Sequence, residues 1–321
     1  MQFDFQALAY GPGIVVICLV ALAFDALSGN IPVLRRLIPH PALVMAALIG
    51  GLAARLNRPE RGPAARLVRG LLVQLVITTL ALLVALGFDY LTDTIPFFWI
   101  LTLLLVMSLM VQRGPFDEVG RVTLGYAEGG LSSARDAAAS VIGPPASQMS
   151  EARLNRALAA HLAGRFADGL VAGVFWLLVL GLPGLVLWRT INIAGRLLDD
   201  ARPDMSTFGL IATRLNEAVG LLPAWLAGLA LSIAAIFVPG ANPLNAFAAM
   251  FGGGGSVGKG EPPRRHSERA PVAAAMAALT GPDPDKQMTG PDVVRAQYLY
   301  AIACLLVFAF AALQLMLRYA I

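Results

Sequence analysis

Six long apolar stretches constrain the fold of this chain more than any other feature. Crossing a bilayer takes about 20 predominantly apolar residues, because the hydrocarbon layer is roughly 30 Å thick and a helix rises about 1.5 Å per residue. The stretches therefore predict an all-α, polytopic membrane protein with five or six transmembrane helices and additional amphipathic cytoplasmic helices. The candidate spans are residues 11–27, 67–88, 95–111, 169–188, 218–238 and 298–317. A seventh run, 42–54, is too short to span and is predicted to be re-entrant or interfacial.

The composition supports a bilayer as the medium around these stretches. Apolar residues make up 57% of the 321, and charged residues make up 14%, against about 25% in a typical soluble domain. The net charge of +4 is small and dispersed, which argues against nucleic acid as a partner. Cys18 and Cys304 each lie inside an apolar run without metal-site spacing, so neither a disulfide framework nor a zinc site is predicted.

Loop charge predicts the orientation in a bacterial inner membrane. The segment between the first two spans holds six arginines and Glu60, whereas 89–94 holds two aspartates and no basic residue. Because basic loops stay in the cytoplasm, the first loop is predicted to be cytoplasmic and 89–94 periplasmic. Six simple spans would then place 189–217 in the periplasm, although it carries four arginines. A hairpin at Pro183 that does not cross would remove this conflict, and the sequence leaves both arrangements open.

We expect one membrane domain over residues 1–321, with two long connections of different character. In 112–168 apolar residues recur at helical spacing, which predicts a helical loop. The segment 239–268 contains four successive glycines and a polar run, and is predicted to be a flexible loop. Its Gly253–Gly260 stretch is similar to a phosphate-binding loop, but Gly260 replaces the required hydroxyl and prolines follow where a helix should begin, which favours a linker.

Several polar residues stand out against the apolar background. Asp25 lies near the end of the first span, where an ionisable side chain is costly and often functional, or else just reaches water at the interface. His40 stands between two prolines, in a turn or in a site. Asp168 and Asn192 lie at membrane boundaries and could be helix caps. With Arg189 and Arg196 nearby, they could also line a site for an anionic substrate. His161, His266 and Asp199-Asp200 are expected to be solvated.

Read in order, these motifs resemble the CobD/CbiB family of cobalamin-biosynthesis membrane proteins. The resemblance covers roughly residues 20–315. It is carried by Asp25, Gly29-Asn30, Pro39-His40-Pro41, Asp168-Gly169-Leu170-Val171-Ala172, Phe175-Trp176, Leu182-Pro183-Gly184, Arg189-Thr190-Ile191-Asn192, Phe208-Gly209, Ala212, Arg214-Leu215-Asn216-Glu217, Pro223-Ala224, Ala270-Pro271 and Ala273-Ala274-Ala275-Met276-Ala277.

The resemblance implies an adenosylcobinamide-phosphate synthase, which joins aminopropanol or its phosphate to a propionate carboxyl of adenosylcobyric acid. It implies a corrinoid substrate and ATP and Mg²⁺, with no tightly bound cofactor, and leaves room for other membrane or corrinoid-pathway proteins as partners. It assigns catalytic roles to Asp25, His40, Asp168 and Glu217, and substrate binding to Arg189, Asn192 and Arg196. Asp168 is also the implied Mg²⁺ ligand. Arg189 stands where the family usually has Lys.

The chain also departs from the family pattern at several polar positions. The family's acidic-amide pair before Asp168 reads Gly164-Arg165, its aspartate after Asn192 is Gly195, and the first of its two aspartates near Glu217 is Asn216. The stretch before the Ala-Met helix reads Ser267-Glu268-Arg269-Ala270-Pro271-Val272. Mg²⁺ requires oxygen ligands, and Gly supplies none from a side chain. Two hypotheses follow: a divergent synthase, or a catalytically inactive membrane regulatory or sensory protein similar to the AmpE type.

Overall fold

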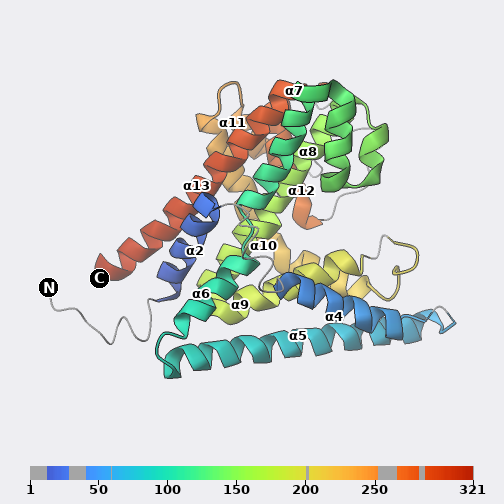
Figure 1. Cartoon of the computed structure of the whole chain (residues 1–321), viewed down its shortest axis with the longest axis vertical. Coiled ribbons are helices and arrows are strands. Elements are labelled where there is room, and N and C mark those ends of the chain that lie inside the picture. The colour runs from blue at the N-terminus through green and yellow to red at the C-terminus, as the bar shows by residue number, and fades with distance from the viewer. Residues whose placement is uncertain are drawn as a thin grey trace. The chain divides into compact units, whose positions relative to one another are not determined.

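The computed structural model describes residues 13–28, 41–58, 60–199, 202–251, 266–281 and 286–320, and every regular element in this part of the chain is helical (Figure 1). The all-α prediction is therefore confirmed. The elements are α2 (Ile14–Ser28), α4 (Pro41–Leu56), α5 (Pro63–Thr94), α6 (Trp99–Leu109), α7 (Arg113–Ile142), η1 (Pro144–Gln148), α8 (Glu151–Arg165), η2 (Phe166–Val171), α9 (Ala172–Leu197), α10 (Leu210–Ala234), η3 (Ala235–Phe237), α11 (Pro243–Phe251), α12 (His266–Thr280) and α13 (Gly290–Ala320).

Five helical runs are long and apolar enough to cross a membrane, as expected of a multi-pass membrane protein. They are Pro63–Thr94, Trp99–Ile142, Glu151–Leu197, Leu210–Phe237 and Gly290–Leu317, and each overlaps one of the last five predicted spans. The first predicted span differs. Within the described residues α2 has 15 residues, about 22 Å of helix, which falls short of the roughly 30 Å hydrocarbon layer.

The chain divides into two compact units, each of which is described by itself. The first unit comprises residues 1–110, 172–220 and 314–321, and the second comprises 111–171 and 221–313.

The first unit is built on α9, against which α2, α4, α5 and α6 pack. Helices α4 and α5 lie side by side and are joined by the short turn at 57–62 (Figure 1). The core between these helices and the start of α10 consists of Ile49, Ala53, Val73, Ile77, Ala194, Leu198, Phe208 and Ala212. Small residues let the backbones approach closely: a Cβ at Gly209 would lie 1.5 Å from the carbonyl oxygen of Leu198. The run 42–54 is thus part of a helix that packs inside this unit.

Helix α9 reverses direction at Gly181, so it is a helical hairpin. Gly181 has a φ of 69°, the left-handed region that glycine adopts readily. A Cβ at Gly184 would lie 2.2 Å from the carbonyl oxygen of Trp176, and one at Gly173 would lie 3.4 Å from a methyl group of Leu185. Residues eight and twelve apart cannot meet in a straight helix that rises about 1.5 Å per residue. Residues 172–180 continue directly the helical run that begins at Glu151.

The segment that follows α9 bears on the orientation conflict in the sequence. By length and composition, the run that contains α9 counts among those able to cross a membrane. The segment after α9 contacts the α4–α5 turn, since Asn57 Nδ2 donates a hydrogen bond to the carbonyl oxygen of Asp204 at 2.9 Å. The basic segment after α9 therefore lies on the same side as the basic first loop, in agreement with the positive-inside rule.

The second unit contains α7, η1, α8, η2, α11 and α12, with α8 packed against both α7 and α12. The segment 112–168, where apolar spacing predicts helices, is occupied by α7, η1, α8 and the start of η2. Helix α7 also reverses direction at Gly129 and Gly130. As a result, a Cβ at Gly125 would lie 3.1 Å from the carbonyl oxygen of Ser133.

One part of the predicted flexible loop 239–268 is ordered. Residues Pro243–Phe251 form α11, which packs against α12. The reason is its apolar content: Ala246 and Met250 are buried, and the Met250 sulfur accepts a hydrogen bond from Ser232 at 3.6 Å. Residues 252–265, including the stretch similar to a phosphate-binding loop, lie outside the described residues.

Candidate functional site

Asp168 lies in η2, a single π-helical stretch between α8 and α9, and its side chain is 4% exposed. This stretch is held by contacts within the second unit. The Val111 N–H donates to the carbonyl oxygen of Gly169 at 3.4 Å, and the Phe166 ring packs edge-on against Tyr300, whose hydroxyl donates to the Gln112 carbonyl oxygen. π-Helical stretches occur frequently at functional sites. Asp168 is therefore a carboxyl held at a fixed place in an otherwise apolar helix.

The second arm of α9 carries the other polar candidates. Arg189 and Asn192 are 5% and 3% exposed, whereas Arg196, one turn after Asn192, is exposed. Asn192 Nδ2 donates a hydrogen bond of 3.2 Å to Asn216 Oδ1 on α10. The arm thus presents a cation and an amide inside the first unit and a second cation at its solvent end.

Gly195 and Asn216, two of the positions at which the chain departs from the family pattern, are in direct contact. A Cβ at Gly195 would lie 2.5 Å from the Cβ of Asn216. The two aspartates expected there would therefore be neighbours in space, and this chain replaces both with uncharged residues at one spot beside Asn192.

The remaining predicted residues are more exposed or outside the described part. The Glu217 side chain is 14% exposed and forms an ion pair with Arg214, with 3.1 Å between Nη1 and Oε2. Asp25 lies in the last turn of α2 and is partly exposed. His40 lies outside the described residues.

The predicted site residues belong to both units. Asp25, Arg189, Asn192, Arg196 and Glu217 belong to the first unit, and Asn192 reaches the residue next to Glu217 through its hydrogen bond to Asn216. Asp168 belongs to the second unit.

His161 forms a contact that sequence reasoning missed. His161 Nε2 lies 3.1 Å from Glu118 Oε2, with side chains 18% and 33% exposed, so the expectation that His161 is simply solvated is wrong. His161, Arg165 and Asp168 are spaced four and three residues apart and thus follow one helix face. That spacing could have been found in the sequence. The partner of His161, Glu118, could not have been found in this way, because it meets His161 only through the packing of α7 on α8.

The described residues fit a magnesium ion in only one way. Among them, no group of three or more His, Cys, Asp or Glu side chains is placed to hold a metal. Mg²⁺ commonly keeps waters and binds through one or two carboxylates together with substrate phosphates. A single buried carboxylate such as Asp168 fits this kind of binding. The described residues do not form a site in which protein groups supply all the metal ligands.

Comparison with known proteins identifies a family and relatives that match most of the chain. Residues 18–281, from α2 through α12, match the family model described as CobD/Cbib protein. The chain belongs to the CobD/CbiB family. It is 32% identical over 235 residues to a cobalamin biosynthesis protein CobD of Sinorhizobium sp, covering 71% of each chain. It is 31% identical to the protein of that name from Brucella anthropi, covering 68% of each. No solved structure matches it.

Proposed function

We propose that this CobD/CbiB family member acts in cobalamin biosynthesis at the bacterial inner membrane, as an enzyme similar to adenosylcobinamide-phosphate synthases. It joins aminopropanol, or its phosphate, to a propionate carboxyl of adenosylcobyric acid. The corrinoid substrate and the aminopropanol compound are its expected ligands.

The observation that carries this proposal is the burial of polar residues at family positions. The family match includes all seven predicted site residues. Asp168, Arg189 and Asn192 are each at most 5% exposed inside apolar helices. Ionisable side chains in such surroundings are costly and mark functional sites. A chain that had become a passive scaffold would gain stability by replacing them.

The chemistry requires an activated carboxyl and a neutral amine. ATP transfers its terminal phosphoryl group to the carboxylate oxygen and leaves as ADP. The amine nitrogen then forms the C–N bond, the C–O bond to the phosphate breaks, phosphate leaves with the electron pair, and the amine releases one proton. Arg189, Asn192 and Arg196 are proposed to bind the anionic groups, since charge-assisted hydrogen bonds to phosphate and carboxylate are the strong ones.

Proton transfer is assigned to carboxylate and imidazole groups. Asp25, His40 and Glu217 keep the roles that the resemblance implies. To these we add the Glu118–His161 pair: a carboxylate bound to one ring nitrogen orients the imidazole, so that the other nitrogen can transfer a proton.

Mg²⁺ is proposed to arrive with ATP and to neutralise phosphate charge, with Asp168 as its protein ligand. The loss of carboxylates at Gly195 and Asn216 removes protein ligands from the first unit, which makes Asp168 the most important single carboxylate. The two relatives named above do not favour the AmpE-type alternative, because each carries a cobalamin-biosynthesis name.

Complementation tests the proposal. A bacterial strain that lacks the synthase is grown where cobyric acid must be converted to cobalamin. We expect the wild-type chain to restore growth and Asp168→Ala to abolish it. Asp136→Ala, an exposed aspartate on α7, serves as the matched control and should restore growth fully. Absence of growth with the wild-type chain, despite its presence in the membrane, would exclude the enzymatic function.

A further inference from the structure

The turn between α4 and α5 presents three arginines to the outside of the first unit. Arg55 ends α4, and Arg58 and Arg61 lie in the turn itself; all three side chains are exposed. Within the described residues, no carboxylate lies within ion-pair distance of any of them, and the acidic residue of the turn, Glu60, is exposed without forming such a pair. Their positive charge is therefore available to an external anion.

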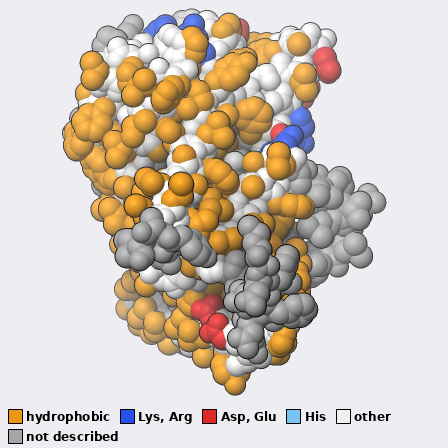
Figure 2. Space-filling view, turned by 90° about the vertical axis from the view of Figure 1, so that its left-hand side faces the viewer, with side chains coloured by type: hydrophobic (Ala, Val, Ile, Leu, Met, Phe, Trp, Pro, Cys, Tyr) orange, Lys and Arg blue, Asp and Glu red, His pale blue; other side chains and the backbone are white. Residues whose placement is uncertain are grey.

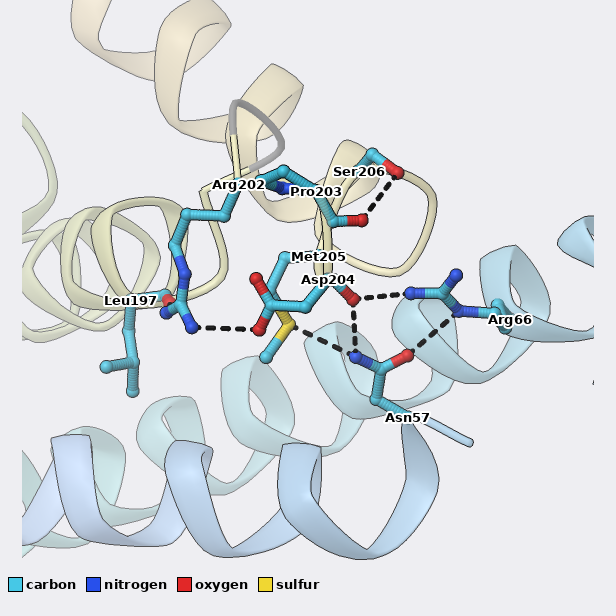
Figure 3. A network of polar contacts seen from close by, with 8 residues as sticks. All are labelled: Asn57, Arg66, Leu197, Arg202, Pro203, Asp204, Met205 and Ser206. Atoms are coloured by element: carbon cyan, nitrogen blue, oxygen red, sulfur yellow. Dashed lines mark hydrogen bonds and ion pairs between the residues drawn. The ribbon is translucent and has the colours of Figure 1, made fainter. Parts of the chain in front are cut away.

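The neighbouring arginines are used differently, for internal contacts that fix the turn in place (Figure 3). Arg66 donates to Asn57 Oδ1 at 2.9 Å and also to the carbonyl oxygen of Asp204. Arg202 forms an ion pair of 2.9 Å with Asp204, and Asn57 donates to the Asp204 carbonyl oxygen. This network joins the α4–α5 turn to the segment after α9. Arg55, Arg58 and Arg61 thus project from a braced turn, with less conformational freedom to lose on binding.

Apolar faces begin directly beside these arginines. On α5 the exposed large side chains start at Val68, at 55%, and continue with Leu72, at 52%, and Leu75, at 53%. On α4 they include Leu43, Val44 and Leu48. Such faces are covered by acyl chains in a bilayer. The three arginines therefore lie at the depth of the lipid headgroups, where the long side chain can lie along apolar surface and its guanidinium can reach phosphate.

We propose that Arg55, Arg58 and Arg61 form a binding site for the phosphate groups of anionic phospholipids in the cytoplasmic leaflet. The charge is complementary, because that leaflet is negative and guanidinium binds phosphate with paired hydrogen bonds. The adjoining apolar faces favour a lipid over a soluble phosphate, since only a lipid satisfies both surfaces at once. This site is independent of the proposed enzymatic function.

Lipid selectivity of the full chain tests the proposal. The purified protein is placed in nanodiscs of phosphatidylcholine with one fifth phosphatidylglycerol, and the lipids retained on gentle extraction are quantified by native mass spectrometry. We expect phosphatidylglycerol to be enriched by roughly tenfold or more, because each basic residue near an anionic surface contributes on the order of a fivefold preference. Arg55→Gln/Arg58→Gln/Arg61→Gln should lose most of this enrichment, and high salt should weaken it.

A control of equal charge change separates this site from general electrostatics. Arg121→Gln/Arg153→Gln/Arg269→Gln alters three exposed arginines of the second unit and should keep the enrichment. Size-exclusion profiles identify misfolded variants, and Arg58→Gln alone should still give a partial loss if the triple variant does not fold. Equal enrichment in wild type and the turn variants, or equal losses in both triple variants, would overturn the proposal. So would displacement of the lipid by ATP or inorganic phosphate at matched phosphate concentration.

Discussion

At the scale of single residues, the contact between Gly195 and Asn216 shows how the departures from the family pattern are linked. Each position alone reads as the loss of one carboxylate. Together they form a close helix contact, because a side chain at 195 would meet the Cβ of Asn216 at 2.5 Å. The absence of a side chain at 195 therefore permits the hydrogen bond between Asn192 and Asn216 in this chain.

We expect Gly195→Asp to destabilise the protein by about 1–3 kcal/mol, the usual cost of overpacking a well-packed contact. Asn216→Gly in the same chain should recover part of this loss, since it removes the atom that the new side chain meets. Thermal unfolding of the detergent-solubilised protein measures both. Additive effects of the two substitutions would contradict the contact, because residues that touch are expected to couple.

The Glu118–His161 pair leads to a second prediction at this scale. His161→Gln should lower kcat for amide formation by about 10²–10⁴, the usual contribution of general acid–base catalysis. Adding Glu118→Gln should cost little more, because the two residues act as a unit. The pH profile of wild type should show a step that His161→Gln lacks.

Tyr126→Phe is the matched control for this pair. It removes another α7–α8 contact, the hydrogen bond of 2.9 Å from the Tyr126 hydroxyl to Asn155 Oδ1. It should reduce stability while leaving kcat and the pH profile unchanged. If His161→Gln behaves in the same way as Tyr126→Phe, the pair serves only to join the two helices.

At the scale of elements, the hairpin in α9 determines the topology of the first unit. Its turn depends on Gly181, whose positive φ an L-residue with a side chain adopts at a cost of about 1–2 kcal/mol. The network around Asp204 then ties the end of α9 to the α4–α5 turn (Figure 3). Helix α5 leads away from this turn to Asp93 at its other end.

Compartment reporters inserted at three positions test this arrangement. Insertions at Arg58 and Asp204 should report the same compartment, the cytoplasm, and an insertion at Asp93 should report the other. The reason is that α5 has 32 residues, about 48 Å of helix, and separates its ends by more than a bilayer core. Opposite compartments for Arg58 and Asp204 would show that the contact between their segments does not form.

At the scale of the whole molecule, apolar side chains face outward on many helices. Figure 2 shows hydrophobic side chains spread over one face of the molecule. Exposed apolar residues along α5, α10 and α13 include Leu83, Leu222 and Leu305. Burial of such side chains against protein is the norm in soluble domains. Here lipid has to cover them, because water would make their exposure unfavourable by about 25 cal/mol per Å².

We therefore expect the chain to remain in the membrane fraction after washing with alkaline carbonate and to be released only by detergent. A variant with the α4–α5 turn arginines replaced should behave identically, since acyl-chain contact and not headgroup binding retains the protein. Release of the wild-type chain by carbonate alone would contradict the multi-pass assignment.

Features that depend on composition and on local spacing could be predicted from the amino-acid sequence. Apolar stretches near 20 residues predict helices that lipid must cover. The helical spacing of apolar residues predicts helices in 112–168, and the series of motifs indicates the family. The polar candidates in these helices could be named from sequence because polar residues are costly there.

The contacts between residues distant in sequence could be found only from the packing of the helices. Four features bring separated positions of the chain together. They are the reversal at Gly181, the approach of Gly195 to Asn216, the pairing of Glu118 with His161 and the bond from Asn57 to Asp204. Helix packing brings such positions together, and spacing along one helix carries no information about its neighbour. The sequence therefore identified the helices and many of the polar residues, whereas packing determined the groups in which those residues lie.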